Sequence, residues 1–141
     1  MASLNRGVLL PGLNTEEWRE WVSYAERDRS EAEDAFSRGV WSEACFHAQQ
    51  ACEKLLKAFL LSKGVFVRVH DIGRLLDEAS LFSPELRALR PSLEPLTIHY
   101  YAARYPNAAR RLGVSYDEGV AEACLRAMRE LWSALRPRLT P

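Results

Sequence analysis

The chain has 141 residues, enough for one hydrophobic core and too few for two domains. Apolar residues make up 48% and charged residues 27%, and the formal net charge is zero. No overall field therefore attracts the protein to nucleic acid or membrane, so such binding would need a local patch. No apolar run reaches the roughly 18 residues of a membrane helix, and the N-terminus lacks the apolar core of a signal peptide. We expect a cytoplasmic protein outside the membrane.

Cysteine and arginine usage gives two further indications. The three cysteines are Cys45, Cys52 and Cys124, and their odd number and wide spacing argue against a disulfide framework or a zinc knuckle. We expect buried structural thiols, no metal site and no cofactor.

Sixteen of the 19 basic side chains are arginine, and Asn and Gln are scarce. This composition favours a thermophilic source, although arginine richness also follows from a GC-rich genome.

Two long helices are predicted in the first half of the chain. Residues 1–13 show no periodicity and are expected to form a tail. Asn14 can cap a helix that runs to about Ser37, because its side-chain oxygen can accept from a free backbone N–H. Arg38-Gly39 ends it, and a short turn leads into a second, antiparallel helix from Trp41 to Gly64. The second helix has a broad apolar arc, which predicts that it is the central helix of a bundle.

The second half predicts short helices and then a third long one. The β-branched run at 65–70 is an extended connector rather than a strand, because a single run has no partner strand. Short helices are expected over 72–79, from Ser83, and over 93–103, with interruptions at the prolines. Residues 106–114 are expected to be a loop, followed by a long helix that a Ser115–Glu118 capping box begins. The predicted fold is an all-α up-and-down antiparallel bundle of four to five helices, three of them long, over residues 14–136.

A polar stripe runs along the second helix opposite its apolar arc. Its spacings of three and four residues align the side chains on one face, and the stripe consists of His47, Gln50, Lys54 and Lys57. A solvated surface explains such a stripe, but Leu61 beside it suits a subunit interface, and the lysines suit a phosphate-binding wall. The solvated surface, the subunit interface and the phosphate-binding wall all stay open at this point. For the interface, the predicted contacts are these four residues and Leu61.

Positive charge is concentrated from the second half of this stripe into the segment that follows it. From Lys54 to Arg74 the only acidic residue is Asp71, whereas residues 16–34 carry much of the acidic excess. Ordinary surface charge would explain the pattern, but such segregation favours a local anion site. We therefore predict that Lys54, Lys57, His70 and Arg74 contact an anion.

The segment HYYAARYP, residues 99–106, gathers aromatic, imidazole and guanidinium groups. In one interpretation Tyr101 and Tyr105 pack in the core and Arg104 pairs with an acid. In the other, His99 and Arg104 form a polar pocket with a tyrosine, able to bind phosphate or transfer a proton. We predict ligand contacts from Arg104, Tyr101 and Tyr105, and catalytic roles for His99 and Arg104 if the protein is an enzyme.

Three stretches together resemble the HEPN domain family: AQQACEKLLKAFLLSKG in the second long helix, the following VHDIGRLL, and the later YYAARYP. The resemblance spans roughly residues 15–135 and includes an RYP motif typical of one branch. It implies a bundle of four to five helices, commonly a homodimer, that often works with a small nucleotidyltransferase in a toxin–antitoxin pair. Many relatives are metal-independent ribonucleases with an Arg followed, after four to six residues, by a His, and no histidine of this chain follows an Arg at that spacing.

The leading prediction is a homodimeric module that binds a nucleotide or an RNA phosphate and acts with a nucleotidyltransferase partner. A second hypothesis is a metal-independent ribonuclease using His99 and Arg104. A third is a structural dimerisation domain without a ligand. An enzymatic role is the less favoured, because the family's ribonuclease motif is not found.

Overall fold

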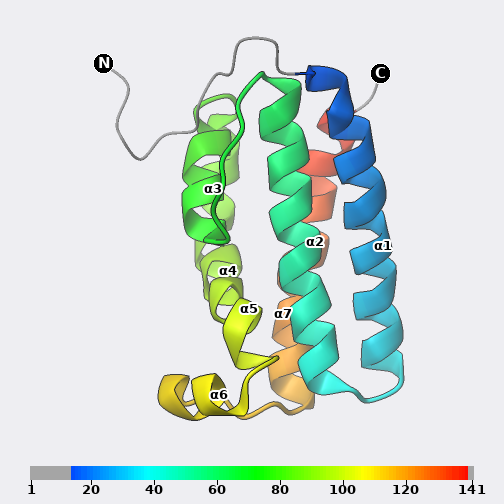
Figure 1. The fold of residues 1–141 in the computed structure, drawn as a ribbon, viewed down its shortest axis with the longest axis vertical. Coiled ribbons are helices and arrows are strands. Elements are labelled where there is room, and N and C mark those ends of the chain that lie inside the picture. Colours follow the sequence, from blue (N-terminus) through cyan, green and yellow to red (C-terminus); the bar gives the residue numbers. More distant parts are fainter. Residues whose placement is uncertain (1–13, 140–141) are drawn as a thin grey trace.

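The computed structural model describes residues 14–139 and begins with a long helical hairpin (Figure 1). Asn14 Oδ1 accepts from the Glu16 N–H at 3.1 Å and caps a 3₁₀ turn, Thr15–Glu17, which leads into α1 (Trp18–Ser37). The chain reverses at Gly39, whose φ of 73° lies in the left-handed region that glycine adopts without strain. Helix α2 (Trp41–Ser62) then returns antiparallel to α1. The predicted hairpin is confirmed.

Helix α2 is the centre of the bundle. Figure 1 shows it between α1 and α3, with α7 (Glu118–Leu135) behind it. Its side chains are buried on nearly every side, including Leu55, Leu56 and Leu60. The prediction of a central helix is therefore confirmed, although its apolar contacts extend further around the helix than one arc.

Short helical segments connect α2 to α7. The connector over residues 65–71 contains no helix, and Asp71 caps α3 (Ile72–Ser80) by accepting from the Arg74 N–H at 3.2 Å. A run of short pieces follows, broken near the prolines as expected because proline lacks an N–H donor. These pieces are η2 (Pro84–Leu89), α4 (Arg90–Leu93), η3 (Glu94–Ile98) and α5 (His99–Ala102).

Two local predictions were wrong in this half. Residues 106–112 form a helix, α6 (Pro106–Leu112), where a loop was expected. Proline fits the first turn of a helix, and Gly113 ends α6 with a left-handed φ of 68°. Helix α7 is capped by Asp117, whose Oδ1 accepts from the Val120 N–H at 2.8 Å, rather than by Ser115.

The described residues thus form an all-α bundle, as predicted, with three long helices and short ones between the second and third. No helix within residues 14–139 is long and apolar enough to cross a membrane. The predicted tail, residues 1–13, lies outside the described residues.

Candidate functional site

The polar stripe of α2 is held by acidic side chains of the same chain. Asp28 of α1 lies 2.9 Å from His47 Nδ1 and accepts from Lys54 Nζ at 2.5 Å. Asp28 and Lys54 are 26 residues apart, so packing of α1 on α2 makes this pair. Lys54, a predicted anion contact, is already neutralised at this point.

The charge state of Asp28 depends on these partners. Burial by itself would raise the pKa of Asp28, but the hydrogen bonds and positive charges of His47 and Lys54 outweigh it and hold the pKa below its usual value. The carboxylate is therefore ionised at neutral pH and binds α1 to the middle of α2.

A second acid, Glu53, organises the other half of the stripe. Glu53 is 5% exposed and accepts from Lys57 Nζ at 2.9 Å and from Gln49 Nε2 at 3.0 Å. His70 Nδ1 lies 3.1 Å from the same carboxylate. Lys57 and His70 are therefore paired inside the chain rather than free to bind an anion.

Two predicted interface residues are enclosed by the monomer. Lys57 is 7% exposed and Leu61 only 1%, because α2 is covered on that side. Neither side chain is accessible to a second subunit in this fold, which corrects the predicted interface at these positions. His47, Gln50 and Lys54 are partly exposed, and their place in an interface stays a prediction.

The end of the bundle formed by α5 and α6 has a different character. Tyr101 is 53% and Tyr105 54% exposed, so the tyrosines do not pack in the core. The exposed guanidinium of Arg104 lies over the Phe46 ring, 3.7 Å from its centroid. Tyr100 continues the aromatic surface, stacked on His70 at 3.9 Å and edge-on to Tyr101. Aromatic and cationic groups thus lie together at this end.

This end also carries unbalanced positive charge. The sequence from Pro95 to Tyr116 has no acidic residue, and it includes the exposed Arg104, Arg110 and Arg111. None of the ion pairs within residues 14–139 involves these three arginines. A hollow of about 300 Å³ lies beside Arg104 and Tyr105, with Glu43 on its wall. We call Tyr101, Arg104, Tyr105, Arg110 and Arg111 the arginine–tyrosine end.

Arg74, another predicted anion contact, is half-buried on α3. Its Nε is buried and has no hydrogen-bond partner among the described residues. A buried donor without an acceptor is uncommon, but a buried Nε is not accessible to an anion, so the anion contact of Arg74 stays a prediction.

His99 does not share a pocket wall with Arg104. It is 5% exposed, and its Nδ1 lies 2.7 Å from the Tyr116 hydroxyl, whereas Arg104 rests on Phe46 at the surface. Burial lowers the pKa of His99 to about 4 and raises the pKa of Tyr116. The predicted catalytic pairing of His99 with Arg104 is therefore not supported, because the imidazole points into the protein.

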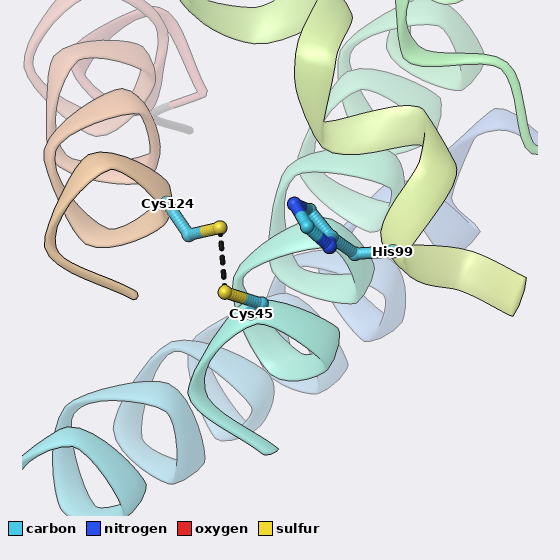
Figure 2. A group of neighbouring side chains, drawn as sticks. All are labelled: Cys45, His99 and Cys124. Carbon is cyan, nitrogen blue, oxygen red and sulfur yellow. Dashed lines mark hydrogen bonds between the residues drawn. The ribbon is translucent and has the colours of Figure 1, made fainter. Parts of the chain in front are cut away.

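His99 instead belongs to a buried cluster with two thiols (Figure 2). The sulfur atoms of Cys45 and Cys124 are 2.8 Å apart, and the neighbouring thiol and burial raise the pKa of Cys45. Sequence reasoning missed this cluster because Cys45 and Cys124 are 79 residues apart and no short spacing marks them. The third thiol, Cys52, is buried elsewhere on α2, as predicted.

Comparisons with known proteins agree with this fold. A sequence model described as "HEPN domain" matches residues 18–137. A protein of Methanocaldococcus jannaschii named "Putative toxin MJ1304" is 26% identical over 102 residues, which is 67% of each chain. The crystal structure of TT1696 from Thermus thermophilus aligns with a TM-score of 0.74 and 28% identity, over 87% of this chain and 98% of that one. The crystal structure of ST0689, "an archaeal HEPN homologue", gives 0.69 and 26% over the same shares.

Proposed function

This chain is a member of the HEPN domain family. We propose that it binds RNA through the arginine–tyrosine end. The module acts as a homodimer, in a toxin–antitoxin-like pair with a small nucleotidyltransferase. The observation that carries the RNA-binding part is the acid-free segment 95–116, with its exposed tyrosines and three arginines that form no ion pair with the described residues 14–139.

The chemistry of this end suits single-stranded RNA. Exposed tyrosine rings offer faces on which unpaired bases stack, each stack contributing about 1–3 kcal/mol by alanine substitution. Arginine binds phosphate through two parallel N–H donors, and Arg104 is already oriented by its contact with Phe46. Phosphate contacts and base stacking together give binding that tolerates many sequences.

The structure changes which predicted residues carry this role. Arg104, Tyr101 and Tyr105 remain as contacts, and Arg74 remains as a half-buried cation on α3. Lys54 and Lys57 act instead as partners of Asp28 and Glu53, which they neutralise, and His70 contacts the Glu53 carboxylate. Because His99 is buried, we propose binding rather than cleavage.

The test is fluorescence-anisotropy titration of a labelled single-stranded RNA, with labelled ATP as a second probe. We expect RNA affinity to fall as salt rises, with a log–log slope of about −2 if three phosphates are neutralised. Tyr105→Ala should weaken binding by about 5-fold or more through lost stacking, and Arg104→Ala should reduce the salt slope by about 0.7.

Arg87→Ala is the matched control, because Arg87 is also exposed but lies on η2, away from this end. Binding that is flat with salt, or weakened equally by Arg87→Ala and Arg104→Ala, would contradict the proposal. Binding of ATP but not RNA would reduce the site to a nucleotide site.

The toxin–antitoxin role and the dimer rest on the family and on one relative's name. Sedimentation equilibrium of the purified chain tests the dimer. Growth arrest on expression of the chain, relieved by a nucleotidyltransferase encoded beside it, tests the pair. Unimpaired growth at full expression would contradict the toxin role while leaving RNA binding to be judged by titration.

A further inference from the structure

We propose that Cys45, His99 and Cys124 form a binding site for a thiophilic divalent cation, Zn²⁺ in the first place. Their ligand atoms all lie within 4.8 Å of one another. The three residues come from α2, α5 and α7, and Figure 2 shows the sulfurs of Cys45 and Cys124 facing each other with the imidazole of His99 beside them. This site is independent of the RNA-binding proposal.

The ligand set matches zinc in type and in charge. Cysteine sulfur and histidine nitrogen are the usual zinc ligands, and thiolates favour soft cations over Mg²⁺ or Ca²⁺. Binding releases one proton from each thiol, so two thiolates and a neutral imidazole balance the charge of Zn²⁺. A net charge of zero matters here, because all three side chains are buried and an unbalanced buried charge is strongly unfavourable.

The imidazole is oriented as in a metal-ligating histidine. Such a histidine binds the metal through one nitrogen while the other is fixed by a hydrogen bond. His99 Nδ1 lies 2.7 Å from the Tyr116 hydroxyl, which leaves Nε2 for the cation. Nε2 has no hydrogen bond to any residue in the described part of the chain.

A cavity provides the fourth coordination position. A pocket of about 660 Å³ lies between α4–α5 and the start of α7, and both His99 and Cys124 are on its wall. A water molecule from this pocket can complete the tetrahedral geometry of zinc. The two sulfurs, 2.8 Å apart, must separate to about 3.8 Å to share one tetrahedral Zn²⁺ at about 2.3 Å each.

The same two sulfurs are also close enough that oxidation to a disulfide is the competing outcome. The position of His99 beside both thiols favours the metal, because a disulfide needs no third ligand. Titration of the reduced full chain with Co²⁺ separates the two. We expect one cobalt per chain, with the absorption bands of tetrahedral cobalt–thiolate, and loss of these bands when one equivalent of Zn²⁺ is added.

Three variants locate the site: Cys45→Ala, Cys124→Ala and His99→Gln should each lose the cobalt–thiolate bands or shift them. Cys52→Ala is the matched control, since Cys52 is equally buried on α2 but lies outside the cluster. Circular dichroism shows which variants fold. If a cluster variant fails to fold, X-ray absorption of the zinc-loaded unmodified chain still decides, with two sulfurs at about 2.3 Å and one nitrogen at about 2.0 Å expected.

Absence of the cobalt bands in the reduced chain would overturn the proposal, and so would bands that survive unchanged in Cys45→Ala or disappear in folded Cys52→Ala. A reduced chain that binds no cobalt but forms a Cys45–Cys124 disulfide in air would assign the pair to thiol redox chemistry instead.

Discussion

The carboxylate of Glu53 on α2 lies 3.1 Å from Nδ1 of His70, which is 17 residues further along the chain in the connector to α3. The same carboxylate accepts from Lys57, one turn along α2. The ring of His70 then stacks on Tyr100 at 3.9 Å. A buried acid of the central helix thereby fixes the connector and, through it, the aromatic surface that the proposed RNA site uses.

Glu53→Gln should be strongly destabilising. The substitution keeps the shape of the side chain but leaves the buried ammonium of Lys57 without a counter-charge, and breaking such a pair costs about 3–5 kcal/mol. Urea unfolding followed by circular dichroism measures the change. The double variant Glu53→Gln/Lys57→Met removes the orphan charge and should be more stable than Glu53→Gln alone. A double variant less stable than the single one would contradict this account.

Asp28→Asn should destabilise the packing of α1 on α2 by about 1–3 kcal/mol, because the charge-assisted bonds from His47 and Lys54 are lost. Lys54 is partly exposed and can turn to water, so the effect should be smaller than at Glu53. The control is Asp34→Asn, at an exposed pair with Arg38, where about 0–1 kcal/mol is expected. Equal losses at both positions would disprove the role of Asp28.

The contribution of Asp28 should depend on pH in one direction. Its pKa is lower in the folded state than its ordinary value of 3.8, so the folded state holds the proton less tightly than the unfolded state. The stabilisation is therefore present above about pH 4 and is lost as the pH falls through the folded-state pKa. The difference in unfolding free energy between the wild type and Asp28→Asn should shrink below about pH 4. A difference that stays constant from neutral pH into strong acid would contradict the lowered pKa.

Two glycines, one at the end of α6 and one at the start of α7, should respond oppositely to alanine. Gly113 has a left-handed φ of 68°, and no atom of the described part of the chain lies within 4 Å of an added Cβ, so Gly113→Ala should cost about 1–2 kcal/mol through backbone strain alone. Gly119 lies in the first turn of α7, and an added Cβ there meets only Asp117 Oδ1, at an ordinary 3.4 Å. Gly119→Ala should stabilise by about 0.5 kcal/mol. Thermal unfolding of both variants checks the signs.

Local chemistry explains which features the sequence could predict. The Asn14 and Asp71 caps and the turn at Gly39 were predictable because each depends on a few neighbouring residues. Helix α6 was missed because Pro106 was interpreted as a breaker although proline also begins helices. The repeating spacing of the α2 stripe was evident, but its surroundings were not.

The pairing of charged groups could not be predicted, because it depends on contacts between distant segments. Lys54 has its partner Asp28 on another helix. The spacing of three and four residues places Asp28 on the same face of α1 as Ala25 and Ala32, but nothing in the sequence shows which residue of α2 it meets. The burial of His99 beside Cys45 and Cys124 arises in the same way, from the packing of α5 and α7 against α2. A polar side chain on a predicted face thus indicates where a site can lie, whereas its partners decide whether it is free to act.

Arg104→Lys should weaken RNA binding although the charge is kept. Lysine cannot reproduce the planar contact of the guanidinium with Phe46, which lies 3.7 Å below it. At an exposed site such a contact is worth about 0.5–1 kcal/mol, so affinity should fall by about 2- to 5-fold. Phe46→Leu, with Arg104 intact, should produce a similar fall, provided that circular dichroism shows a folded protein.

The double variant Phe46→Leu/Arg104→Lys completes a cycle that tests whether the two residues act together. If Phe46 serves RNA binding only by orienting Arg104, the double variant should bind no more weakly than the weaker of the two single variants. Losses that add in full would show that Phe46 and Arg104 contribute independently, and the orienting role of the ring would then be wrong. Salt titration of the four proteins separates the effects further, because only a change in phosphate contacts alters the slope.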